Sequence, residues 1–310
     1  MKKIIVHNPS NERTKNYRYY NYFFDQFTEH LKNFFEVEEN RYFELAHSTR
    51  YPIWLQKRIN DYDDILECEY VIENSENGEF VVMTISDSIT GIIFSEKRNP
   101  YFKKGLVAQF LPREIYLNGE KYMYKLSPWV YFKSNMVDIE PYYQKRLNNP
   151  PTNNKICFRG VTTDRPIISH IDKNIITSSD ILTPTTYFDD IITYKMSLSV
   201  DGAAEFCYRD IECFGLGVPI LRFEYLSKMY NELIPNYHYI SVPRPDDLRL
   251  YRLGNEFHAR LIEKRYYEVL NDTEFLNFIS KNARKYYEDN CQINNLIKNT
   301  HNLLNLNSWI

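Results

Sequence analysis

The turn Asp201-Gly202-Ala203-Ala204 and the arginine that follows it, Arg209, have the clearest potential for chemistry in this chain. The surrounding stretch, residues 194–223, predicts a strand, a tight turn, a helix and a second strand. Small residues let a ligand approach the backbone, and the N–H groups at a helix start favour phosphate. Arg209 cannot lose its positive charge. Together these features predict a binding site for a diphosphate. Asp201 can equally stabilise the turn by hydrogen-bonding to its own backbone.

The elements that must position this turn alternate between strands and helices, which predicts parallel α/β sheets. In the first half we expect strands at Lys3–His7, Val37–Leu45, Cys68–Ile72 and Phe80–Ser86, and helices at Tyr19–Phe35 and Pro52–Ile59. In the second half we expect strands at Lys155–Arg159, Ile175–Ser178, 194–200, 218–223 and Tyr237–Val242, and helices after Thr163 and at Tyr225–Leu233, Glu274–Asn290 and Ile293–Leu304. Ligands of such sheets bind beyond the carboxyl ends of the strands, where Asp87, Gly160, Asp201 and Gly202 are expected.

The chain has 310 residues, enough for two domains of ordinary size. The segment Asn148–Asn154 is polar and contains two prolines, so it is the best candidate for a linker. We therefore expect one α/β domain over residues 1–150 and a second over residues 151–310, with helices at the C-terminal end.

Composition narrows the classes of function. The net charge of −3 gives no support for general binding to nucleic acid, which favours a basic face. No stretch approaches the roughly 20 apolar residues of a membrane span, and the N-terminus lacks the apolar core of a signal peptide. The five cysteines are widely spaced and lack a zinc-ligand pattern, which favours free, buried thiols. We expect a cytoplasmic protein.

Three motifs in the second half carry a family resemblance. The first is Phe158-Arg159-Gly160, ending a strand just before a helix, and the second is the block from Tyr194 to Phe223. The third is the segment from Leu233 to Val242, followed by the acidic pair Asp246-Asp247. In this order and spacing, over roughly residues 155–290, the chain resembles glycosyltransferase family 90, which includes protein O-glucosyltransferases and capsule xylosyltransferases.

The resemblance implies a GT-B-like fold, in which two Rossmann-like domains face a cleft and are closed by C-terminal helices. It also implies an inverting enzyme that uses UDP-glucose or UDP-xylose, needs no bound metal and glycosylates a glycan or glycoprotein. The C-terminal domain would bind the donor and the N-terminal domain the acceptor. Asp87 falls where the family has its catalytic base.

The donor-binding residues follow from the same resemblance and from the predicted helix starts. They are Arg159, Gly160, Thr162, Thr163, the turn from Asp201 to Ala204, and Arg209. Inversion requires a base that removes the proton of the acceptor hydroxyl. It also requires hydrogen-bond donors that stabilise the negative charge on the leaving UDP.

Several candidate residues also have a purely structural interpretation. Arg159 at a strand end can be an ion-pair residue, and Asp87 can cap a helix. His238 is expected to be structural. Tyr101, Phe102 and Trp129 can stack on a sugar acceptor, but core packing is the simpler role for each.

Two other functions remain open from the sequence. Asp61 and Asp63 form a DxD pair that can hold a divalent metal, as in GT-A glycosyltransferases, although no apolar strand precedes it. A carbohydrate-binding protein that keeps a degenerate transferase fold is the non-catalytic alternative.

Overall fold

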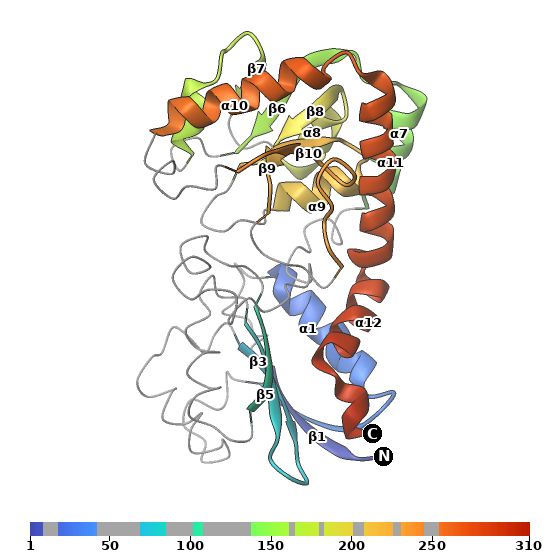
Figure 1. Ribbon diagram of the computed structural model, residues 1–310. Coiled ribbons are helices and arrows are strands. Elements are labelled where there is room, and N and C mark those ends of the chain that lie inside the picture. The colour runs from blue at the N-terminus through green and yellow to red at the C-terminus, as the bar shows by residue number, and fades with distance from the viewer. Residues whose placement is uncertain are drawn as a thin grey trace. The chain divides into compact units, whose positions relative to one another are not determined.

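The computed structural model describes residues 1–8, 18–41, 69–84, 102–107, 138–160, 165–179, 183–200, 208–225, 231–244 and 254–310. It shows two compact units, each built around its own five-stranded sheet with helices packed against it (Figure 1). The predicted α/β class is confirmed.

The two units are not separated by a single break at residue 150. The first unit contains residues 1–132, 227–231 and 293–310, and the second contains residues 133–226 and 232–292. Helix α7 (Glu140–Asn148) belongs to the second unit because Arg146 is buried there. Its guanidinium donates hydrogen bonds to the carbonyl oxygens of Gly217, Ile192 and Tyr194.

The sheet of the first unit has the order β2-β1-β3-β4-β5. Its strands are β1 (Lys3–Asn8), β2 (Glu36–Arg41), β3 (Glu69–Asn74), β4 (Phe80–Thr84) and β5 (Phe102–Val107). This sheet is mixed rather than parallel, because β3 runs antiparallel to both β1 and β4. Only five residues separate β3 from β4, too few for the crossover that parallel strands need. Gly78, at φ +72°, allows this tight turn.

In the described part of the first unit, α1 (Arg18–Leu31) and α12 (Ile293–Leu304) pack against this sheet, and a 3₁₀ helix, η7 (Leu306–Trp309), follows α12. The α1 side chains Phe23, Phe24 and Phe27 are fully buried, as the expected helical spacing predicts. Phe24 stacks on Tyr70 of β3, with ring centroids 4.7 Å apart. Strand β1 and helix α12, far apart in the sequence, therefore belong to the same unit.

The sheet of the second unit is entirely parallel and has the order β10-β9-β8-β6-β7. Its strands are β6 (Asn153–Arg159), β7 (Ile176–Ser179), β8 (Tyr194–Leu198), β9 (Ile220–Phe223) and β10 (Ile240–Val242). This is the doubly wound, Rossmann-like arrangement that the second half of the sequence predicts. Helices α8 (Pro184–Ile191), α9 (Tyr208–Gly215), α10 (Gly254–Val269) and α11 (Thr273–Asn290) and the 3₁₀ helix η5 (Pro166–His170) surround it.

Side-chain alternation gives this second sheet two different faces. On one face, Ile156, Phe158, Leu198, Leu221 and Ile240 join an apolar core with residues of α10 and η5. The intervening positions carry buried polar or charged residues, and these are Cys157, Arg159, Ser197, Arg222 and Ser241. Such a polar face is unusual for a buried sheet surface, and it contains Arg159, one of the predicted site residues.

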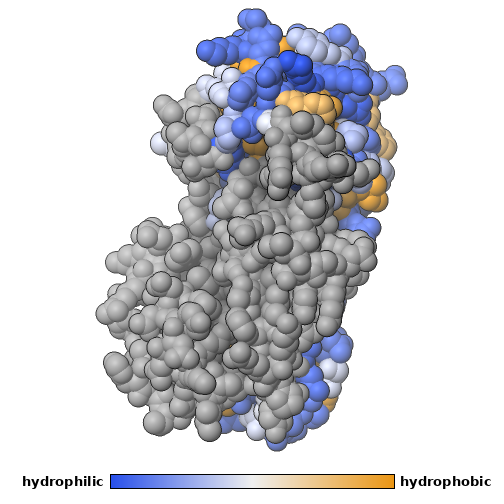
Figure 2. Space-filling model, turned by 60° about the vertical axis from the view of Figure 1, so that its left-hand side comes forward, coloured by the Kyte–Doolittle hydropathy of each residue, from blue (hydrophilic) through white to orange (hydrophobic). Residues whose placement is uncertain are grey.

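The described part of the surface is mostly hydrophilic on the face drawn in Figure 2, with smaller hydrophobic patches between. The larger exposed hydrophobic side chains of the second unit are Leu147, Ile234, Tyr237, Phe257, Tyr267 and Phe278. Among the helices that the structure describes, none combines the length and apolar character that crossing a membrane requires.

Candidate functional site

The strand order of the second unit reverses between β6 and β8. The chain passes from β6 outward to β7 and then returns across β6 to β8, which continues to β9 and β10. In open parallel sheets, ligands bind beyond the carboxyl ends of the strands at such a switch point. Here β6 ends at Arg159, followed by Gly160, and the segment after β8 leads to the start of α9. The sequence predicts its donor site at this same edge of the sheet.

Arg209 lies at this switch point. It comes from the first turn of α9, and its Nη2 donates a short hydrogen bond to the carbonyl oxygen of Arg159, 50 positions away in the sequence. Its guanidinium carbon is 4.4 Å from the centroid of the Phe158 ring, within range of a cation–π contact. The arginine predicted to bind a diphosphate and the Phe158-Arg159-Gly160 motif are thus in direct contact.

Gly160 gives Arg209 the space for this contact. Its φ of +152° is one that residues with a side chain rarely adopt, and a Cβ built there would lie 2.8 Å from Arg209 Nη2. Only a residue without a side chain therefore permits both this backbone conformation and this position of the guanidinium.

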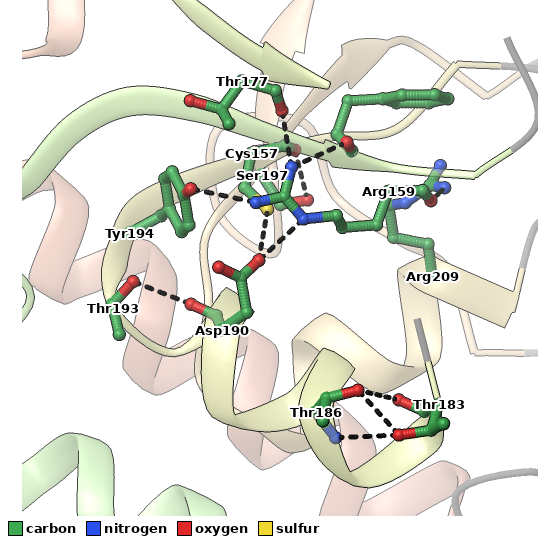
Figure 3. Close-up of polar contacts among 11 residues, drawn as sticks. Cys157, Arg159, Thr177, Thr183, Thr186, Asp190, Thr193, Tyr194, Ser197 and Arg209 are labelled. Atoms are coloured by element: carbon green, nitrogen blue, oxygen red, sulfur yellow. Dashed lines mark hydrogen bonds and ion pairs between the residues drawn. The ribbon is translucent and has the colours of Figure 1, made fainter. Parts of the chain in front are cut away.

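Arg159, also predicted to bind the donor, directs its side chain to internal partners, away from Arg209 (Figure 3). Its Nε donates to Asp190 Oδ2 at 2.7 Å, and its Nη2 donates to the Tyr194 hydroxyl at 3.0 Å. Its Nη1 donates to the carbonyl oxygens of Phe158 and Thr177. The alternative interpretation of Arg159, an ion-pair residue, matches this geometry, although the side chain is buried rather than exposed.

Asp190, the partner of Arg159, lies near the end of α8, which the sequence analysis missed. Thr183 caps this helix by accepting a hydrogen bond from the Thr186 amide, and Pro184 follows the cap (Figure 3). A threonine followed by a proline is a common helix start, so this signal was present in the sequence. The same carboxylate lies 3.9 Å from the Cys157 Sγ, and burial raises the pKa of that thiol to about 12.

A second buried ion pair holds the start of α9. Asp210, the residue after Arg209, accepts a hydrogen bond from Arg222 of β9, with 2.7 Å between Nη1 and Oδ2. The Arg222 guanidinium carbon also lies 3.5 Å from the centroid of the Tyr225 ring. Thus one arginine–aspartate pair joins β6 to α8 and another joins β9 to α9, and both arginines lie on the polar face of the sheet.

His238 has the structural role predicted for it. Its Nδ1 accepts a hydrogen bond from the backbone N–H of Ile234 at 2.9 Å, and its ring packs 5.1 Å from that of Tyr286. Burial lowers the pKa of His238 to about 4, which keeps the ring neutral at physiological pH.

The helix expected at Tyr225–Leu233 is not seen at either end, because Tyr225 and residues 231–233 are not helical.

The remaining predicted site residues lie outside the described residues. These are Asp87, Thr162, Thr163, Asp201, Gly202, Ala203 and Ala204, together with the alternative metal ligands Asp61 and Asp63 and the aromatic candidates Tyr101 and Trp129. Phe102 belongs to β5. Within the described ranges, no group of three or more His, Cys, Asp or Glu side chains is arranged to hold a metal ion.

No protein-family model matches the sequence, and no curated protein sequence matches it. Solved structures do resemble it. A glycosyltransferase from Rickettsia africae ESF-5 has a TM-score of 0.46 at 11% identity, covering 97% of this chain and 89% of its own. A sucrose-phosphate synthase from Thermosynechococcus elongatus has a TM-score of 0.47 at 10% identity, covering 96% of this chain and 94% of its own. Anabaena HepE, solved in complex with UDP and glucose, has a TM-score of 0.37 at 12% identity, covering 72% of this chain and 63% of its own.

Proposed function

We propose that this chain is a glycosyltransferase that moves a sugar from a UDP-sugar to a hydroxyl group of a glycan or protein acceptor. The observation that carries the proposal is the contact between Arg209 and the end of β6. Two motifs that suggest a nucleotide-sugar site in the sequence, Phe158-Arg159-Gly160 and the block from Tyr194 to Phe223, meet there. They meet at the switch point of a doubly wound sheet, where phosphate-bearing ligands bind in this class of fold.

The proposed chemistry follows from what the residues can do. Departure of the sugar leaves negative charge on the UDP diphosphate, and fixed cationic donors stabilise that charge in the transition state. Arg209 supplies such a donor, and the turn from Asp201 to Ala204 with Thr162 and Thr163 would add backbone and hydroxyl donors. Asp87 is the proposed base that accepts the proton of the acceptor hydroxyl. The reaction would invert the anomeric centre without a metal, with xylose or glucose as the sugar.

Nucleotide binding tests the donor site. A ligand that binds only the folded state raises its melting temperature, so UDP, GDP, CMP and several UDP-sugars should be compared with and without EDTA. We expect stabilisation by UDP and UDP-sugars that EDTA does not remove. Stabilisation that EDTA abolishes would favour the metal-dependent alternative at Asp61 and Asp63. No response to any nucleotide would favour the non-catalytic carbohydrate-binding alternative.

Substitution of Arg209 tests its assignment to the diphosphate. Charge-assisted hydrogen bonds contribute about 1.5–3 kcal/mol, so Arg209→Ala should weaken UDP binding roughly 10- to 100-fold in calorimetry. Arg209→Lys retains the charge but loses the planar pair of donors, and a smaller loss is expected. Arg260→Ala is the matched control, because that side chain is 71% exposed on α10. Equal UDP affinity in Arg209→Ala and the unaltered protein would remove Arg209 from the site.

Substitution of Asp87 tests the chemical step separately. Asp87→Asn should abolish sugar transfer because the amide cannot accept the proton, while UDP affinity should remain unchanged. Donor hydrolysis and transfer to candidate glycan acceptors provide the readout. Full activity in Asp87→Asn would show that another group is the base.

A further inference from the structure

The main chain at the end of β6 forms a seat for the guanidinium of Arg209. The Arg159 carbonyl oxygen accepts its hydrogen bond, and the Phe158 ring lies under its guanidinium carbon at 4.4 Å. Gly160 bounds the third side, where a Cβ would lie 2.8 Å from Nη2. Three consecutive residues therefore fix one side chain from a helix that follows two strands later.

We propose that Gly160 is a positioning residue for the donor site. Because it has no side chain, the Arg209 guanidinium can occupy the position from which it hydrogen-bonds the diphosphate. This inference rests on the proposed function, in which Arg209 binds UDP. Gly160 itself makes no contact with the donor through a side chain, so its effect on binding passes through the position of the guanidinium.

The hydrogen bonds of Arg159 keep this seat in place. Its side chain donates hydrogen bonds to Asp190, to the Tyr194 hydroxyl and to the carbonyl oxygens of Phe158 and Thr177 (Figure 3). A strand end fixed in this way holds its own carbonyl oxygen at a defined position. Arg159 therefore contributes to the site through its backbone carbonyl oxygen, which accepts the hydrogen bond from Arg209, while its guanidinium holds the strand end in position.

The position of Arg209 matters because arginine binds phosphate oxygens through two parallel hydrogen bonds. In enzyme sites, a displacement of about 1 Å can lower the reaction rate on the order of 100-fold, because the groups no longer match the geometry of the substrate. An alanine Cβ at position 160 would meet the far end of the flexible Arg209 side chain, so the guanidinium would have to move, and the backbone at φ +152° would be strained as well. The expected consequence is weaker binding of UDP, together with a lower melting temperature.

A double-mutant cycle tests this coupling. UDP affinity is measured by calorimetry in the unaltered protein, Gly160→Ala, Arg209→Ala and the double variant. We expect Gly160→Ala to weaken binding by about tenfold or more, and to cause no further loss once Arg209 is alanine. Gly78→Ala is the matched control, because Gly78 has a φ of +72° but no atom within 4 Å of the added Cβ. It adds a Cβ at a positive φ without a steric contact, and it should leave UDP affinity unchanged.

The outcomes separate this inference from the function on which it rests. If Arg209→Ala weakens binding and Gly160→Ala weakens it further in that background, the two residues act independently and the positioning role is wrong. Unchanged affinity in Gly160→Ala would also overturn it. Failure of the unaltered protein to bind UDP, or unchanged affinity in Arg209→Ala, would overturn the donor-site assignment and the positioning role together. Melting temperatures of all four proteins show that each is folded at the temperature of the measurement.

Discussion

Arg222 of β9 and Asp210 of α9 form an ion pair in which neither side chain has solvent-accessible surface, with 2.7 Å between Nη1 and Oδ2. Removing one charge from such a pair leaves the other buried without its partner, which costs about 3–5 kcal/mol. We therefore expect Asp210→Asn to lower the free energy of unfolding by several kcal/mol in urea titrations.

The double variant Arg222→Met/Asp210→Leu distinguishes loss of the charge pair from loss of packing. Apolar side chains of similar volume often replace a buried pair without a loss of stability. The double variant should therefore be more stable than Asp210→Asn alone. An Asp210→Asn protein as stable as the unaltered one would show that the pair does not hold α9.

Asp190 offers a comparison within a single helix. Its carboxylate accepts a hydrogen bond from Arg159, whose side chain is only 7% exposed, whereas the adjacent Asp189 pairs with Lys145 at a site where both side chains are about half exposed. Asp190→Asn should lower the free energy of unfolding by about 2–3 kcal/mol, and Asp189→Asn should change it by less than about 0.5 kcal/mol. Equal effects of the two substitutions in urea unfolding would contradict the anchoring role of Asp190.

The strands of the second unit could be predicted from the sequence because short apolar runs mark buried parallel strands. Each of these predicted strands is present, although β10 starts at Ile240 rather than Tyr237. Helix α10 was missed even though Ala259, Ile262, Tyr266 and Val269 have helical spacing and are buried. The antiparallel hairpin of the first unit was missed despite Asn77-Gly78, a frequent hairpin turn.

The candidate site could be predicted only in part, for a physical reason. Local patterns identify a strand end, a helix start and a charged residue, and these led to Arg209 and Gly160. The partners of buried arginines depend on which helix packs on which strand, and periodicity does not specify that pairing. The pairs Arg159–Asp190 and Arg222–Asp210 therefore required the tertiary structure.

Three cysteines that the structure describes in the second unit provide a test of burial. Cys157, Cys213 and Cys291 are free and buried, as the sequence predicts for thiols without a zinc-ligand pattern. Burial raises the pKa of each thiol, and the thiolate is the form that reacts with alkylating agents. We expect iodoacetamide at about pH 8 to leave these three positions unmodified in the native protein and to modify them in concentrated urea, as peptide mass mapping would show. Rapid modification of Cys157 in the native protein would contradict its buried position.

His238 should make stability depend on pH in a defined direction. Burial lowers its pKa to about 4, below the value of about 6.5 in an unfolded chain, so the unfolded state binds the proton more tightly. The contribution of the neutral His238 ring to the free energy of unfolding is complete above about pH 6.5 and is lost as the pH falls through 4.

Partial exposure of the ring reduces this contribution to about 2 kcal/mol. The difference in unfolding free energy between the unaltered protein and His238→Asn should therefore grow by about that amount between pH 4 and pH 6.5 and then level off. Urea titrations across this range measure the unfolding free energies of both proteins. A difference for His238→Asn that is the same at both ends of the range would mean that the imidazole is not held neutral by the fold, and the hydrogen bond from the Ile234 amide would then need another explanation.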